Sequence, residues 1–115
     1  MENNAKDTRI TVVYKQPGVK AKLQVIDNTL EAFQTLVDGY IETACRLSPD
    51  LFVICNEEGK LRKMESNLYF LRNGWVVDEI VGPVVISKLG EDGDFIDMDP
   101  EECLRAEHWL EDHQL

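Results

Sequence analysis

The residues best suited to do chemistry lie between positions 55 and 61, where the sequence reads CNEEGKL. Cys55 offers a thiol nucleophile, and Glu57 and Glu58 offer two carboxyl groups for acid–base work. A cysteine nucleophile needs a base that forms the thiolate, but both histidines of the chain are distant in sequence. Adjacent glutamates on a solvated turn would both be ionised, whereas an acid and a base need different environments. We therefore predict a turn at the end of a strand, with Cys55 as a buried thiol and no catalytic residue.

The three cysteines and two histidines are also the candidates for a metal site. No Cys-x-x-Cys pair occurs, and His108 and His113 are about 140° apart around a helix. The acidic stretch DGDFIDMDPEE could suggest an EF-hand calcium loop. Counted from Asp92, however, the fifth position, which needs an oxygen ligand, is Ile96, and the sixth, which needs glycine, is Asp97. We expect neither a metal nor another cofactor. The odd cysteine count without a secretory signal predicts free thiols at Cys45, Cys55 and Cys103.

The first third of the chain predicts a hairpin followed by a helix. Residues 10–15 and 21–26 are apolar, β-branched runs separated by a Gln-Pro-Gly turn. Asn28 is placed to cap a helix over residues 29–37, and a glutamate three residues later completes a capping-box pattern. Gly39 is placed to end this helix in the left-handed conformation.

Two strands then lead into the candidate turn. Residues 40–47 alternate like a half-buried strand, and a Ser-Pro-Asp turn follows. Residues 51–55 form a continuous apolar run, which is typical of a strand buried on both faces. The chemically interesting residues are thus expected at the exit of a central strand.

Beyond the turn the sequence predicts three more strands. Residues 67–72 and 75–81 flank an Asn-Gly pair, which indicates a hairpin because a type I′ turn needs positive φ at both central residues. Residues 84–89 form another strand, and Pro83 is confined to its start because it cannot donate to a ladder.

The last segment predicts a helix. Asp99 is its N-cap, Pro100 its first residue, and Glu102 completes a capping box. The apolar stripe consists of Cys103, Ala106, Trp109, Leu110 and His113. The charged residues expected largely outside this stripe are Glu101, Glu102, Arg105, Glu107, Glu111 and Asp112.

The length and composition predict a single globular domain. The 115 residues are 43% hydrophobic and 30% charged, so we expect one domain over residues 1–115, with residues 1–7 as a flexible N-terminus. The first residues contain neither a basic region nor an apolar stretch of a leader, and no apolar run is long enough to span a bilayer. We expect a cytoplasmic protein that does not enter membranes.

Negative charge is concentrated at the C-terminal end. The net charge is −10, and residues 91–115 contain 10 acidic side chains and a single basic one, Arg105. Such a field repels nucleic-acid phosphates and attracts basic partners. Lys60, Arg62 and Lys63 form a short basic stretch near two aromatic residues, but direct nucleic-acid binding needs a basic face that this composition disfavours.

Two stretches of the chain, VIDNTLEAFQTLVDGYIE and LFVICNEEGKL, resemble a family of small proteins from bacteriophages and bacterial mobile elements whose function is not established. The resemblance covers about residues 8–98 and implies the same fold, but no activity. A family that keeps the Asn-Glu-Glu-Gly turn keeps it either for geometry, with Gly59 at positive φ, or for contact with a partner. The positions that match the family pattern are Ile26 to Asn28, Gly39 to Glu42, Cys55 to Lys60, Asn67, Ile80, Gly82 and Ile86.

We expect an α+β fold with a mixed, mainly antiparallel sheet of about six or seven strands. The helix over residues 29–37 is expected on one face, and the acidic C-terminal helix at an edge or on the same side.

The leading functional hypothesis is a non-enzymatic accessory protein of a phage or mobile element that binds a host or phage protein through its acidic C-terminal face, for example as a nucleic-acid mimic. One alternative is a small-molecule or nucleotide binder, or an enzyme, with its pocket near the Cys55–Lys60 turn; another is a structural homodimer. The candidate partner-binding residues are Asn56, Glu57, Glu58, Asn67, Glu101, Glu107, Glu111 and Asp112.

Overall fold

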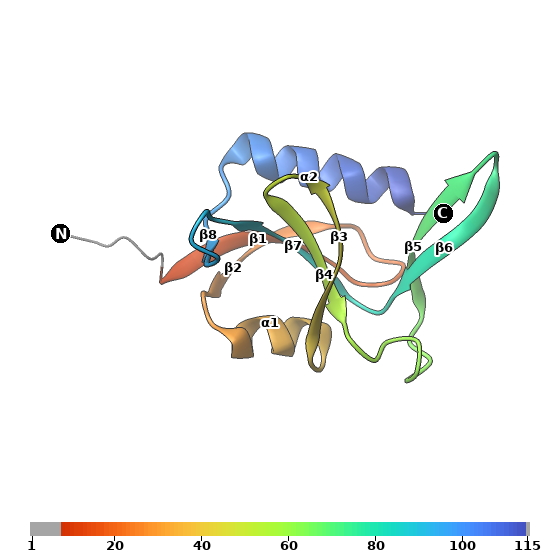
Figure 1. Cartoon of the computed structure of the whole chain (residues 1–115), viewed down its shortest axis with the longest axis horizontal. Helices are drawn as coiled ribbons and strands as arrows, with labels where there is room; N and C mark the ends of the chain where they lie inside the picture. The colour runs from red at the N-terminus through yellow and green to blue at the C-terminus, as the bar shows by residue number, and fades with distance from the viewer. Residues whose placement is uncertain (1–7, 115) are drawn as a thin grey trace.

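The computed structural model describes residues 8–114, which form a six-stranded antiparallel sheet, a separate two-stranded sheet and two helices (Figure 1). This architecture confirms the α+β class and the antiparallel character of the sheet. Residues 1–7, expected to be a flexible N-terminus, lie outside the described residues. In chain order the elements are β1 (Arg9–Lys15), β2 (Lys22–Asp27), α1 (Leu30–Val37), β3 (Ile41–Ser48), β4 (Leu51–Asn56), β5 (Ser66–Arg72), β6 (Trp75–Val81), β7 (Val84–Leu89), β8 (Phe95–Ile96) and α2 (Pro100–His113).

The strand order in the large sheet is β2-β1-β7-β4-β3, with β8 paired to β7. β1 and β2 form the predicted hairpin, and β7 lies between β1 and β4. β4 is the buried strand predicted from its continuous apolar run. The end of β4, where the candidate turn begins, therefore lies next to the edge strand β3.

The two helices cover opposite faces of the large sheet (Figure 1). Phe33 of α1 packs in a cluster with Val85, whereas Leu110 of α2 packs in a cluster with Ile86. Our expectation that α2 lies at an edge or on the same side as α1 is therefore wrong. Successive residues of a strand point to opposite faces, so a strand that is apolar at consecutive positions needs a cover on both sides.

The β5–β6 hairpin extends away from the large sheet as a two-stranded sheet of its own (Figure 1). Asn73 and Gly74 at its tip have φ values of 51° and 81°, as the Asn-Gly prediction requires. Between β6 and β7, Gly82 adopts φ 78° and Pro83 lacks an N–H donor, so the chain leaves the two-stranded sheet there and β7 pairs with β1 and β4.

The caps of α1 differ from the prediction by one residue at each end. Thr29, and not Asn28, is the N-cap, and its Oγ1 accepts a hydrogen bond of 3.2 Å from the N–H of Ala32. Asn28 instead donates its side-chain amide to the carbonyl oxygen of Phe95 at 2.8 Å. At the C-terminus Asp38 takes the left-handed conformation that we assigned to Gly39, with φ 61°.

The N-terminus of α2 is capped as predicted, since Asp99 and Glu102 form a reciprocal capping box. Glu102, however, is only 7% exposed, which corrects its placement outside the apolar stripe. Its carboxylate lies 2.8 Å from Nζ of Lys88 on β7, and this ion pair raises the pKa of the lysine. The buried glutamate is thus tied to the sheet by a charge that comes from a distant strand.

Candidate functional site

The candidate turn is organised around the side chain of Asn56, which is 4% exposed. Its Nδ2 donates to the carbonyl oxygens of Val37 and Asp38, both at 3.0 Å, and its Oδ1 accepts from the N–H of Glu58 at 2.7 Å. Asn56 thus binds the carbonyl groups left open at the end of α1. A Cβ at Gly39 would lie 2.6 Å from its Nδ2, so glycine leaves room for this contact.

Gly59 of the turn is needed for close packing and not for a positive φ. We expected a positive φ at Gly59 as one reason for the Asn-Glu-Glu-Gly turn, but Gly59 does not have a positive φ, so this reason is wrong. A Cβ there would lie 2.9 Å from Cγ2 of Val81 on β6. The turn therefore packs closely against the β5–β6 hairpin, while Glu57 and Glu58 remain exposed.

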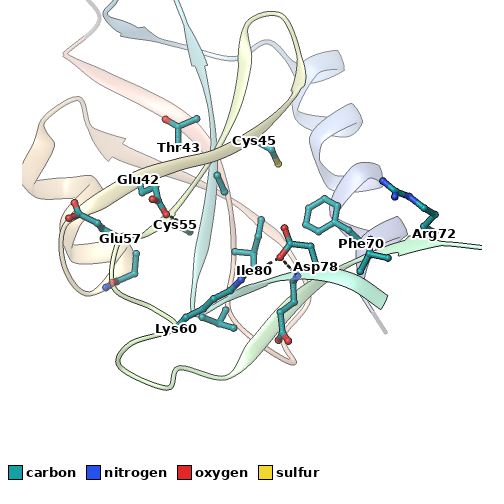
Figure 2. A pocket seen from close by; sticks show the side chains of 15 residues that line it. Glu42, Thr43, Cys45, Cys55, Glu57, Lys60, Phe70, Arg72, Asp78 and Ile80 are labelled. Atoms are coloured by element: carbon teal, nitrogen blue, oxygen red, sulfur yellow. Dashed lines mark hydrogen bonds and ion pairs between the residues drawn. The ribbon is translucent and has the colours of Figure 1, made fainter. Parts of the chain in front are cut away.

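A cleft of about 820 Å³ opens between the turn, β3 and the β5–β6 hairpin (Figure 2). Glu42, Thr43, Ala44 and Cys45 of β3 form one wall, and five consecutive residues of β6, from Val77 to Val81, form another. Cys55, Asn56, Glu57 and Lys60 contribute from the end of β4 and the turn, and Phe70 and Arg72 contribute from β5. A pocket near the Cys55–Lys60 turn, as one hypothesis expected, is thus present.

The thiol in this cleft is not activated as a nucleophile. Burial, together with the nearby Glu42 carboxylate, raises the pKa of Cys55 to about 11. Its Sγ lies 4.0 Å from Oε2 of Glu42, to which the thiol donates. Burial and the charge of Asp78 likewise raise the pKa of Cys45. Both thiols are therefore neutral near pH 7, and all three cysteines of the chain are free.

The two histidines lie on α2 and are not among the residues that line the cleft. His113 stacks on Trp109 with ring centroids 4.0 Å apart and also contacts Phe70 at 5.0 Å. Its Nδ1 lies 2.7 Å from the carbonyl oxygen of Trp109. The ring therefore helps to join α2 to β5, and it does not provide the base that a cysteine nucleophile would need.

Charged side chains surround the cleft, with more acidic than basic groups. Nζ of Lys60 lies 3.4 Å from Oδ1 of Asp78 (Figure 2). The pKa of Asp78 is lowered by a hydrogen bond from the backbone N–H of Glu79 and by Lys60. The acidic residues that line the cleft are Glu42, Glu57, Asp78 and Glu79, and the basic ones are Lys60 and Arg72.

The candidate residue Asn67 lies elsewhere, beside a second cleft of about 540 Å³ between the β1–β2 turn, β5 and the end of α2. Its Nδ2 donates to the carbonyl oxygens of Lys15 and Gly82, and its Oδ1 accepts from Nζ of Lys15 at 2.6 Å. Lys15 is only 2% exposed, and burial lowers its pKa. The amide of Asn67 thus holds a buried lysine in place.

The C-terminal candidate residues lie on α2, away from the turn and from the cleft between β3 and β6, but Glu111 lines the second cleft together with Asn67. Glu101, Glu111 and Asp112 are exposed, and Glu107 is half-buried. The structure therefore places Asn56, Glu57 and Glu58 at the turn, Asn67 beside Lys15, and the four acidic residues on α2, where Glu111 shares the second cleft with Asn67.

The sequence did not predict the cleft walls that β3 and β6 provide. Glu42 and Asp78 are more than thirty positions apart and belong to different sheets, so no local pattern links them. Lys15 is the last residue of the predicted strand over residues 10–15, and the amide that holds its buried Nζ is 52 positions away.

Within residues 8–114, no three side chains of the metal-binding types gather closely enough to hold a metal ion. The described helices include none that is both long and apolar enough to cross a bilayer.

Comparison with curated proteins and with solved structures gave no match. The family model described as a domain of unknown function (DUF3846) matches residues 10–111, which is most of the chain. The protein therefore belongs to the DUF3846 family.

Proposed function

We propose that the protein is a non-enzymatic accessory protein of a phage or mobile element that binds a host or phage protein through the acidic surface of α2. The observation that carries the proposal is the position of the charge. Residues 91–115 contain 10 of the 22 acidic side chains but only one of the 12 basic ones; five of the ten lie on α2, and Glu101, Glu111 and Asp112 of these are exposed. Such a surface attracts a basic partner over long range and repels nucleic acid.

The chemistry of the cleft supports a binding function over a catalytic one. A thiol with a pKa of about 11 is protonated at neutral pH, and the acid beside it raises its pKa further instead of removing its proton. The exposed side chains of Glu57 and Glu58 offer no difference in environment that would separate an acid from a base.

The test compares two variants with the same net charge. In the first, Glu101, Glu107 and Glu111 are replaced by Gln and Asp112 by Asn. In the control, Asp27 and Asp38 are replaced by Asn and Glu31 and Glu65 by Gln; all four are exposed and lie outside the turn at Asn56 and outside the cleft between β3 and β6. Each variant loses four negative charges, so non-specific effects of net charge are matched.

The immobilised proteins are incubated with a bacterial lysate at low and at high salt, and the captured proteins are quantified. The α2 variant is expected to recover at least about tenfold less of a partner that wild type captures at low salt, while the control recovers a similar amount. Circular dichroism checks that both variants fold. If the α2 variant captures as much as wild type, or if the control loses as much as the α2 variant, the proposed surface is wrong.

A second candidate function, the binding of a small molecule or nucleotide, is favoured by the cleft at the Cys55–Lys60 turn. Its volume of about 820 Å³ lies within the range of ligand sites. The cleft is lined by four carboxylates and by two basic side chains, Lys60 and Arg72. This excess of negative charge disfavours a phosphate-bearing ligand and favours a cationic one. Calorimetric titration with nucleotides and with polyamines distinguishes these ligand classes.

A further inference from the structure

We propose that the cleft between β3 and β6 binds an extended, basic segment of another polypeptide, which adds as a strand to the free strand edges that border the cleft. This inference concerns a different surface from the acidic side of α2 and does not depend on it.

The first support is that β3 is an edge strand with an open side. It is the last strand in the order β2-β1-β7-β4-β3, and Glu42, Thr43 and Ala44 are exposed. An edge strand presents unpaired N–H and C=O groups to which another strand can pair. A register shift between Thr43 and Cys45 places Ala44 outside the ladder, so the regular part of this edge ends at Thr43.

The opposite wall of the cleft is a second edge without a strand partner among the described residues, on β6, where the N–H of Glu79 donates to Oδ1 of Asp78 at 2.8 Å. The small sheet has only two strands, so β6 pairs with β5 on one side and has no strand partner on the other within the described residues. Consecutive residues of a strand point alternately to its two faces. All five residues from Val77 to Val81 line the cleft, which indicates that the edge of β6, and not one of its faces, borders it.

Charge complementarity identifies the kind of segment. Glu42 and Glu57 lie on one side of the cleft and Asp78 on the other (Figure 2). The only basic side chains at the lining are Lys60, which is paired with Asp78, and Arg72. A segment with Lys or Arg side chains therefore meets an excess of carboxylates.

Apolar side chains also line the cleft, which selects against a simple polyamine. Cys45, Cys55, Phe70 and Ile80 contribute largely uncharged surface to the cleft. An extended peptide places alternate side chains on opposite faces, so apolar residues can contact this surface while basic residues reach the carboxylates. A segment of about five residues spans roughly 17 Å. Only a peptide backbone can also pair with the strand edges.

The experiment uses hexapeptides in which Lys or Arg alternates with Val, Ile or Phe. Binding to uniformly ¹⁵N-labelled protein is followed by NMR, and the affinity of the best peptide is measured by fluorescence anisotropy. The same peptide with N-methyl groups at alternate residues keeps the charge but cannot pair along one edge. We expect amide shifts at residues 41–43 and 77–81, and an affinity at least about tenfold lower for the N-methylated peptide.

Two variants with matched loss of charge locate the site. Combined Glu42→Gln and Asp78→Asn are expected to weaken binding at least about fivefold, whereas combined Glu111→Gln and Asp112→Asn on α2 change it less than about twofold. The proposal is overturned if no peptide shifts the amides of β3 and β6. It is also overturned if N-methylation has no effect, if spermidine binds as tightly as the peptide, or if the α2 variant loses as much affinity as the cleft variant. The α2 variant changes the surface for which a basic partner was proposed above. If that proposal fails, the difference in peptide affinity expected between the cleft variant and the α2 variant stays the same.

Discussion

Asn56 at the end of β4 donates a hydrogen bond of 3.0 Å to the carbonyl oxygen of Val37 at the end of α1. The same amide nitrogen reaches the carbonyl oxygen of Asp38, which also accepts a hydrogen bond of 2.6 Å from Arg62 of the turn. Asn56, in the CNEEGKL stretch, thus caps the C-terminus of α1, which ends almost twenty residues earlier in the chain. Because the side chain of Asn56 makes these contacts, the candidate side chains of the turn that remain exposed are Glu57 and Glu58.

Replacing Asn56 by Ala is expected to lower the free energy of unfolding by about 1–3 kcal/mol, because buried carbonyl groups at the end of α1 lose their donor. Asn56→Asp keeps the acceptor for the N–H of Glu58 but turns a carboxylate toward two carbonyl oxygens. Its loss of stability should therefore be larger at pH 7 than at a pH where that carboxyl is protonated. Urea midpoints measured across pH check both variants, and equal costs for Asp at both pH values would contradict this arrangement.

Gly74→Val should destabilise the protein by about 1–3 kcal/mol, because a β-branched residue is strained at the φ of 81° found at the hairpin tip. An added Cβ meets no atom within 4 Å, so a steric clash does not contribute. Gly74→Asn is the control, since asparagine tolerates positive φ and should cost less. Denaturation midpoints decide the outcome. Equal costs for both variants would show that backbone conformation is not the cause.

The stability that Cys55 contributes should decline at alkaline pH. Its folded-state pKa of about 11 lies above the ordinary value of 9.0, so the unfolded state loses its proton first as the pH rises. The contribution is complete below about pH 9 and disappears as the pH rises through 11. The stability difference between wild type and Cys55→Ala should narrow over this range. Val53→Ala, a truncation on the same strand without a titrating group, should show a constant difference, and identical behaviour of the two variants would refute the assignment.

Lys15 should have the opposite effect on the pH dependence. Burial lowers its folded-state pKa below 10.5, so the unfolded state binds more protons and the stability of wild type rises with pH between the two pKa values. Lys15→Met removes this rise, whereas Lys20→Met, at an exposed lysine beside the same cleft, retains it. Thermal unfolding from pH 8 to pH 10.5 provides the measurement. A slope that Lys15→Met leaves unchanged would mean that the amine is not desolvated in the folded state.

The sequence alone determined the features whose causes lie within a few residues. Asn73 and Gly74 specify their turn because few residues tolerate positive φ, and Asp99 and Glu102 specify the start of α2 because their hydrogen bonds are reciprocal and local. The apolar run of β4 likewise indicated a buried strand, and Cys55 its buried end, at 6% exposure. These predictions needed no information about distant parts of the chain.

Tertiary structure decided everything that depends on a distant partner. Both Asn28 and Thr29 have side chains that can cap a helix. Thr29 is the N-cap because the side-chain amide of Asn28 donates to the carbonyl oxygen of Phe95, 67 positions away. Glu102 turns inward because Lys88 provides a counter-charge. Strands that are apolar at consecutive positions do not specify which helix covers which face. The chain leaves the hairpin for the large sheet at Gly82 and Pro83, and residues of β3 and β6, which belong to different sheets, line a common cleft that no local pattern encodes.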